Sequence, residues 1–353
     1  MKKVSSSPHI HSGASTQNIM FSVALALTPA CLWGVYAFGL RALVVLLVSI
    51  GTSLLVEYLL GKVSKEYTLW DGSALVTGML IGMNMSPSIP LFIPIIASAF
   101  AIAVCKWTFG GLGANWANPA IGGRVFVFFS FTSAMSSFTM PRSLVIADAT
   151  SSATPLSLVK TIVSSGEALG STSLDILSKE AYPMSSFAQK ISSALGISGY
   201  NIDAFIGNIP GCIGEVSSLL LIAGGIYLLC RKIITWHIPV SFIGTWALLT
   251  WVFGGIPNGN GAFHGEVISN LLRGGLILGA LFMATDMVTS PITYKGMVIF
   301  GAGCGFFTFL FRSFGSLPEA TSVAILLMNI VVPTIDRFCI PKKFGESVKE
   351  EKK

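Results

Sequence analysis

Long apolar runs separated by short polar segments dominate this 353-residue chain. A helix needs roughly 20 apolar residues to cross about 30 Å of hydrocarbon. The chain therefore predicts an all-α polytopic membrane protein with about ten transmembrane helices. They are expected at 19–38, 42–60, 71–85, 90–108, 118–136, 212–230, 237–254, 267–284, 295–311 and 317–335. The third run is short and rich in glycine before Pro87, which indicates an irregular helix.

A short segment of the third run recurs in the eighth. Residues 78–87 align with 282–291, and the identical pairs are Met79/Met283, Met83/Met287, Ser86/Ser290 and Pro87/Pro291. Each half of the chain has five predicted spans, an odd number, so the second half enters the membrane from the opposite side. This predicts two inverted five-helix repeats, an arrangement that places a site near the midplane between them. Chance similarity between two Gly/Met-rich helices is the alternative.

Composition and charge agree with this class. Hydrophobic residues make up 52% and charged residues only 11% of the chain, unlike a soluble domain. Lys and Arg are retained on the cytoplasmic side, which places both termini there and explains the formal charge of +6 without nucleic acid. We expect no cleaved signal peptide. The predicted regions are a cytoplasmic segment (1–18), a first repeat (19–136), an external loop (137–211), a second repeat (212–335) and a cytoplasmic tail (336–353).

Familiar catalytic and metal-binding motifs are missing from the sequence. The six cysteines are scattered singly and the four histidines are dispersed, so we expect no metal site. We identify no catalytic residue, because no nucleotide-binding glycine motif and no nucleophile–base motif stands out. Soluble-type NAD chemistry within this chain is therefore not expected.

Ionisable residues inside predicted spans are candidates for ion transport, because burying charge in a membrane is unfavourable. Asp286 is the best candidate for a cation or proton contact, since it lies beside Thr285 in the repeated segment. Glu57 and Glu215 lie near span ends, so a side chain that extends to the interface or caps a helix explains each of them as well as a role in ion transport does. Two basic residues, Arg124 and Arg273, also fall inside predicted spans.

The segment 148–156, Asp-Ala-Thr-Ser-Ser-Ala-Thr-Pro-Leu, stands in the long polar stretch of the chain. Taken alone, such a segment is more often an ordinary Ser/Thr-rich turn than a site. Its interpretation depends on the rest of the sequence.

Several motifs together resemble the RnfD/NqrB family over nearly the whole chain. The resemblance is strongest to the RnfD side of the family, because the long N-terminal extension expected of NqrB is missing. The motifs are Ser-Pro-His-Ile-His-Ser (7–12), Asp-Gly-Ser-Ala-Leu-Val-Thr-Gly-Met-Leu (71–80), Phe-Gly-Gly-Leu-Gly-Ala-Asn-Trp-Ala-Asn-Pro-Ala (109–120), Gly214-Glu215 and the Ser-Ala-Thr-Pro-Leu segment.

The resemblance implies FMN linked by a phosphoester to a threonine, and the matching residue is Thr154. The attachment motif then comprises Asp148, Ser151, Ser152 and Ala153, where Ser152 replaces the glycine usual in the family. A flavin transferase needs a pliable substrate segment, so we expect this one to be exposed. The family also implies a second, noncovalent flavin, riboflavin, near the cytoplasmic side, which no sequence pattern locates.

The resemblance further implies a component of the Rnf complex, an ion-translocating ferredoxin:NAD oxidoreductase of the bacterial inner membrane. It would relay electrons and help couple them to Na⁺ or H⁺ transport, and it is not expected to be catalytic alone. The implied partners are the membrane proteins RnfA and RnfE, the flavoprotein RnfG, the iron–sulfur proteins RnfB and RnfC, the flavin transferase and membrane lipid. A flavin-free channel or transporter for a small solute is the alternative, and a structural scaffold is a third hypothesis.

Overall fold

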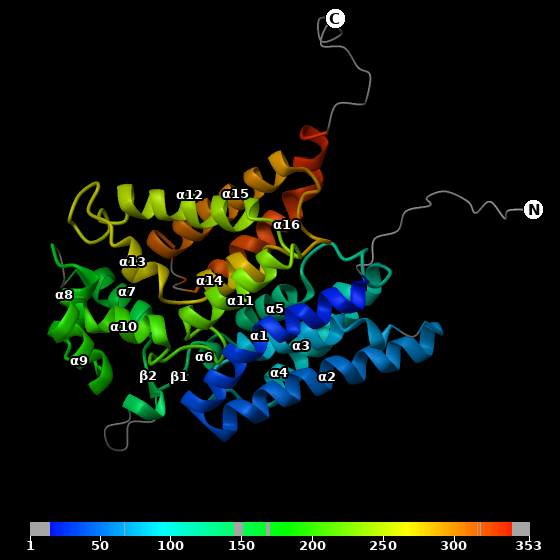
Figure 1. Ribbon diagram of the computed structural model, residues 1–353, viewed down its shortest axis with the longest axis horizontal. Coiled ribbons are helices and arrows are strands. Elements are labelled where there is room, and N and C mark those ends of the chain that lie inside the picture. Colours follow the sequence, from blue (N-terminus) through cyan, green and yellow to red (C-terminus); the bar gives the residue numbers. More distant parts are fainter. Residues whose placement is uncertain are drawn as a thin grey trace, which may run out of the picture.

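The computed structural model describes residues 15–66, 68–144, 151–166, 170–315, 317 and 319–340. Long helices lie along one axis of an elongated bundle (Figure 1). Five of them are long and apolar enough to cross a membrane. These are α1 (Thr16–Phe38), α2 (Leu40–Ser64), the continuous helix Phe92–Phe109, α15 (Tyr294–Ser313) and α16 (Thr321–Phe338). The prediction of a helical membrane protein is confirmed in this respect.

The remaining predicted spans also coincide with helices, but shorter ones. Four apolar helices have 10 to 17 residues: α3 (Ser73–Met83), α5 (Pro119–Ser130), α11 (Ser218–Cys230) and α12 (His237–Phe253). The eighth predicted span is broken into α13 (Val267–Leu271), α14 (Leu276–Leu278) and the π-helical turn η5 (Gly279–Met283). Helix Phe92–Phe109 is likewise composite, with α4 (Phe92–Phe100), π-helical η2 (Ala101–Lys106) and 3₁₀-helical η3 (Trp107–Phe109).

Small residues let the helices approach closely, as membrane helix packing favours. A Cβ atom added at Gly78 of α3 would lie 2.7 Å from the Cα atom of Ile50 in α2. One added at Gly224 of α11 would lie 2.5 Å from the carbonyl oxygen of Ala26 in α1. The N-terminal and C-terminal parts of the chain thus pack against each other through α1 and α11, and also through α5 and α16.

The predicted external loop is largely helical rather than irregular. After α6 (Thr132–Met135), the two-residue strands β1 (Phe138–Thr139) and β2 (Ser151–Ser152) pair antiparallel, with η4 (Arg142–Leu144) between them in sequence. Four short helices follow: α7 (Pro155–Ser165), α8 (Ser173–Lys179), α9 (Ser186–Leu195) and α10 (Gly199–Ile206). Helices α7 and α8, with Tyr182 from the loop after them, form a small core of Val159, Ile176, Leu177 and Tyr182, against which Tyr200 of α10 packs.

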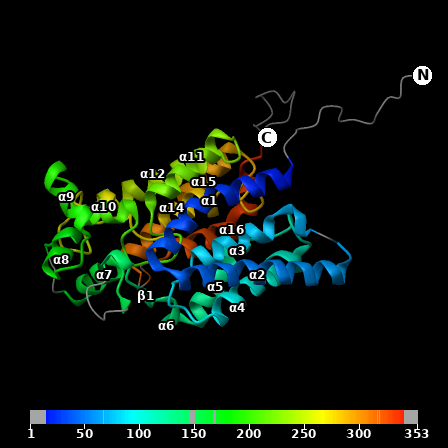
Figure 2. The same cartoon turned by 60° about the horizontal axis from the view of Figure 1, so that its bottom comes forward.

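This group of short helices caps one end of the bundle. Both views place α7 to α10 at the end opposite the start of α1 and the end of α16 (Figures 1 and 2). The Tyr182 hydroxyl donates to the carbonyl oxygen of Ala153 at 3.0 Å, which fixes the chain just before α7. The fold therefore holds Thr154 between the cap and the bundle.

Candidate functional site

A buried arginine lies at the centre of the bundle. Asn118 caps α5 by accepting from the Ala120 amide at 3.0 Å, and Pro119 occupies the first turn, where a missing N–H is tolerated. One turn further, the inward face of α5 carries Arg124, which is 4% exposed. Burial of a guanidinium is unfavourable unless it is paired and hydrogen-bonded, so its partners define the site.

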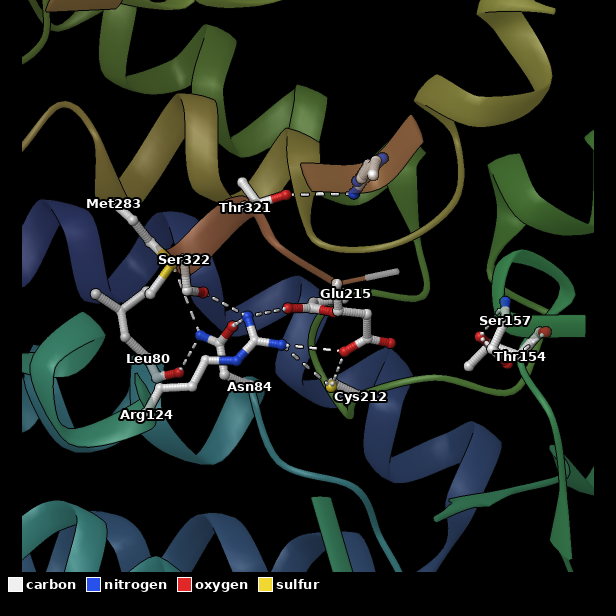
Figure 3. A network of polar contacts seen from close by, with 12 residues as sticks. Leu80, Asn84, Arg124, Thr154, Ser157, Cys212, Glu215, Met283, Thr321 and Ser322 are labelled. Carbon is white, nitrogen blue, oxygen red and sulfur yellow. Dashed lines mark hydrogen bonds and ion pairs between the residues drawn. The ribbon is translucent and has the colours of Figure 1, made fainter. Parts of the chain in front are cut away.

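Arg124, on α5, contacts side chains of three other segments (Figure 3). Its Nη1 atom donates to Asn84 Oδ1 at 2.6 Å, Glu215 Oε1 at 3.0 Å and Ser322 Oγ at 2.7 Å. Its Nη2 atom donates to Glu319 Oε2 at 3.2 Å. Asn84 follows α3, Glu215 precedes α11, and the other two partners lie just before and within α16. One side chain therefore connects the N-terminal and C-terminal parts of the protein.

Two carboxylates and a thiol surround the guanidinium. The candidate ligand atoms of Cys212, Glu215 and Glu319 lie within 4.8 Å of one another, and the Arg124 Nη2 atom is 3.9 Å from Cys212 Sγ. Arg124 thus occupies the position in which a bound cation would offset the negative charge of the two acids. Glu215 is only 4% exposed, so it does not extend to the membrane interface as one interpretation of the sequence allowed.

Thr154 forms the N-cap of α7. Its Oγ1 atom accepts from the Ser157 amide at 3.1 Å and donates to Ser157 Oγ at 2.9 Å. The expectation that the attachment segment is exposed is wrong for this side chain, which is 5% exposed because α7 packs down on the bundle. Ala153 is exposed, and Ser151 and Ser152 form β2. Asp148 lies outside the described residues.

A small cavity brings Thr154 together with the charged cluster. Its volume is about 10 Å³, and Thr154, Glu215, Glu319 and Arg273 line it. This is room for about one water molecule. The sequence placed Thr154 and Glu215 in different kinds of site. Glu319 was not among the candidates, although this ionisable residue falls inside the predicted span 317–335. The structure combines them in one site between the bundle and its cap.

A second, larger cavity lies at the other end of the bundle, near the start of α1. It has a volume of about 110 Å³ and a mostly apolar lining that includes Lys106, Asp286, Thr77 and Asn115. The half-buried Asp286 accepts from Thr289 Oγ1 at 3.0 Å through its Oδ2 atom. Asp286 and Glu215, both candidates for ion transport in the sequence, thus line different cavities.

Glu57 is part of a network beside this second cavity. Lys106 Nζ lies 2.7 Å from Glu57 Oε1 and also donates to Ser73 Oγ at 2.7 Å. Trp107 Nε1 donates to Glu57 Oε2 at 3.0 Å, and the Thr68 hydroxyl bonds the other oxygen. Glu57 is 1% exposed, so it neither extends to the interface nor caps a helix end.

Comparison with known proteins assigns the family. The sequence model of the NQR2, RnfD, RnfE family matches residues 3–345. The chain belongs to this family. The D component of the proton-translocating ferredoxin:NAD(+) oxidoreductase complex of Clostridium ljungdahlii is 41% identical over 343 residues, which cover 97% of this chain and 96% of the relative. The RnfD/NqrB resemblance predicted from the motifs is confirmed.

Two further relatives of this RnfD-type chain have names that give either a different ion, Na(+), or no particular ion. The corresponding component of the Na(+)-translocating ferredoxin:NAD(+) oxidoreductase complex of Acetobacterium woodii is 37% identical, covering 99% of this chain and 98% of the relative. That of the ion-translocating oxidoreductase complex of Stutzerimonas stutzeri is 38% identical, with 95% and 94% covered. The relatives are thus subunits of ion-translocating oxidoreductase complexes, and their names do not agree on the ion.

Proposed function

We propose that this chain is the RnfD component of an Rnf-type ferredoxin:NAD oxidoreductase in the bacterial inner membrane, and that it relays electrons through FMN covalently bound to Thr154. The observation that carries the proposal is the shared cavity of Thr154, Glu215 and Glu319. A redox group on Thr154 would stand beside two buried carboxylates that both pair with Arg124. Electron transfer and ion movement could then be coupled by local electrostatics.

The position of Thr154 suits a phosphoester. In the attachment step the Thr154 hydroxyl forms a bond to the FMN phosphorus of FAD, AMP leaves with its phosphate, and the hydroxyl proton is released. The linked phosphate would lie at the N-terminus of α7, where backbone amides and the helix dipole favour an anion. Because the hydroxyl is buried, we infer that the transferase acts while the first turn of α7 is open. Bound FMN supplies one-electron chemistry that the side chains cannot.

The cavity near the start of α1 is the proposed place for the noncovalent riboflavin. Its apolar walls would cover an isoalloxazine ring, and Thr77 and Asn115 offer polar groups for orientation. The Asn115 Oδ1 atom is buried without a hydrogen-bond partner among the described residues, which is unfavourable unless a ligand or water donates to it. This cavity lies at the end of the bundle where α1 begins and α16 ends.

We also propose the ten-span inverted repeat. Several contacts support it because they join elements at equivalent positions of the two halves: α1 with α11, and α5 with α16. Asn84, just after α3, places its Nδ2 atom 3.8 Å from the sulfur of Met283 at the end of η5. A two-fold axis in the membrane plane produces such pairing of equivalents. The same arrangement puts both termini on one side and α7 to α10 on the other, and the distribution of Lys and Arg assigns the side of the termini to the cytoplasm.

Ion coupling is proposed to involve Glu215 with Glu319 near the flavin, and Asp286 and Glu57 at the opposite end. The complex is expected to supply the remaining route through the membrane proteins RnfA and RnfE. Its redox partners are expected to be the flavoprotein RnfG and the iron–sulfur proteins RnfB and RnfC. Whether Na⁺ or H⁺ moves is left to measurement, since the relatives' names include both.

A Thr154→Val variant of the whole complex in proteoliposomes tests the function. We expect in-gel flavin fluorescence of this subunit, ferredoxin:NAD turnover and ion uptake all to be lost while the complex still assembles. A Ser157→Ala variant, which keeps the attachment hydroxyl, is the matched control. Turnover that persists in Thr154→Val would favour a scaffold, and a wild-type subunit without flavin would favour a channel or transporter.

A further inference from the structure

Among the described residues, two buried arginines near Thr154 form no salt bridge. Arg273 is 1% exposed; its Nη2 atom contacts Asn201 Oδ1 at 3.4 Å, and its Nε atom has no hydrogen-bond partner within the described chain. Arg312 is 9% exposed, and its Nη1 and Nη2 atoms donate to neutral oxygens at 3.3 to 3.4 Å. In the described part of the protein, no carboxylate lies within 4 Å of either guanidinium. Such buried charge is unfavourable unless an anion joins it.

The loop that carries Arg273 is held tightly beside α7. Gly274 has a φ of +73°, and a Cβ atom there would lie 2.8 Å from Arg312 Nη2 and 3.5 Å from Leu156 Cδ2. A Cβ atom at Gly275 would lie 2.4 Å from Glu215 Oε1. The two glycines let the break between α13 and α14 fit between the charged cluster and the first turn of α7. Arg273 and Thr154 consequently line the same cavity.

Formal charges around this cavity do not balance. Among the described residues in and around it, Arg124, Arg273, Arg312 and Lys160 carry four positive charges, while Glu215, Glu319 and Glu266 carry three negative ones. Glu266, the acid that acts on Arg273 at longer range, already accepts from the Ser173 amide at 2.7 Å. The N-terminus of α7 adds a partial positive charge at Thr154. One negative charge at Thr154 would neutralise the group, and a phosphodiester carries one.

We propose that Arg273, together with the N-terminus of α7, binds the phosphate that links the flavin to Thr154. This inference rests on the proposed function. It assigns the phosphate-binding group of the site to a residue that the sequence showed only as an arginine inside a predicted span. Arg312 donates to the carbonyl oxygens of Asn270 and Arg273, which holds the loop in place, and it adds a further positive charge near Arg273. Arg273 is thus a positioning residue for the cofactor rather than a catalytic one.

Thermal unfolding of flavin-bearing and flavin-free protein tests the assignment. Wild type, Arg273→Lys, Arg273→Gln and the exposed control Lys179→Gln would each be prepared with and without active transferase, and flavin content measured by intact mass. We expect the flavin to raise the Tm of wild type, Arg273→Lys and Lys179→Gln by a few degrees, and to leave that of Arg273→Gln almost unchanged. An equal rise in Arg273→Gln overturns the assignment. A wild type that takes up no flavin overturns the proposed function instead.

A flavin-independent variant covers the case in which Arg273→Gln does not accept flavin. Thr154→Glu places one negative charge at the N-cap of α7. We expect Thr154→Glu to be more stable when Arg273 is present than in the Arg273→Gln background, after subtraction of the effect of Arg273→Gln alone. No coupling between the two substitutions would overturn the assignment.

A phospholipid headgroup also carries a phosphodiester, so a further experiment is needed to distinguish it from the flavin phosphate as the group that Arg273 binds. Added phosphatidylglycerol would be titrated against the Thr154→Val variant, with and without Arg273→Gln. The assignment predicts no stabilisation that depends on Arg273. Stabilisation by lipid that Arg273→Gln abolishes would assign the arginine to lipid and overturn the role at Thr154.

Discussion

Arg124 Nη1 lies 3.0 Å from Glu215 Oε1, although the two residues are 91 positions apart in the sequence. The pair joins α5 to the segment before α11, and a second ion pair to Glu319 at 3.2 Å ties in the start of α16. The relationship gives the two parts of the chain a common electrostatic centre beside Thr154. A change in charge at Thr154 should therefore alter the electrostatic potential at both Glu215 and Glu319.

Removing the central charge should destabilise the bundle strongly. Arg124→Gln leaves Glu215 and Glu319 buried without their partner, and breaking a buried pair in this way costs about 3–5 kcal/mol. The Tm of the purified subunit should fall, or the subunit should fail to assemble. Arg124→Lys keeps the charge but not the fork of donors, so we expect an intermediate loss. A normal Tm for Arg124→Gln would contradict the proposed role of this network in joining the two parts.

The Lys106–Glu57 pair offers a double-mutant cycle at the opposite end of the bundle. Either Lys106→Met or Glu57→Gln alone disrupts a buried network, so both should lower the Tm. The double variant removes both formal charges, and we expect it to be more stable than the sum of the single effects predicts. Additive losses would show that the 2.7 Å contact contributes little. Ion uptake by the double variant would show in addition whether Glu57 belongs to the pathway.

Lys160 on α7 should make stability depend on alkaline pH. Burial, and then repulsion from Arg312, lowers its pKa from 10.5 to about 8. The folded state therefore binds this proton less tightly than the unfolded state. The unfavourable contribution is fully present below pH 8 and is relieved as pH rises from about 8 to 10.5. The Tm of wild type relative to Lys160→Gln should rise across this window, and a constant difference would contradict the assignment.

Asp286 tests the ion pathway separately from the redox chain. Asp286→Asn keeps the shape and the contact to Thr289 but removes the negative charge. We expect flavin content and assembly to remain normal while ion uptake per electron falls in proteoliposomes. Thr289→Val, which removes only the hydrogen bond, is the matched control. Unchanged ion uptake in Asp286→Asn would remove this residue from the pathway.

Hydropathy predicted the positions of the helices well, because each apolar run has to be helical in a membrane. It did not predict the break at Arg273, Gly274 and Gly275, since an average over a window does not register a left-handed glycine. Glu215 and Arg124 were recognised as unusual from their positions, but their partnership was not. Glu319 stands outside the helices, and only the packing of α16 against α5 brings it to the site.

The burial of Thr154 was also not predicted from the sequence. The motif identified the residue, and the small polar neighbours predicted an exposed loop. The structure instead uses Thr154 as the cap of α7, and the buried face of that helix, including Pro155 and Val159, holds the threonine against the bundle. Short amphipathic helices such as α7 give weak signals in a chain dominated by membrane spans. Burial here depends on tertiary packing rather than on local composition.

The most direct measurement is the intact mass of the purified subunit, expressed with its flavin transferase, for wild type and Thr154→Val. The proposed function predicts that wild type is heavier than its sequence by FMN less one water, that peptide mapping places the addition on Thr154, and that the variant has the unmodified mass. A wild-type mass equal to the sequence, with the transferase shown to be active on another substrate, would contradict the central claim.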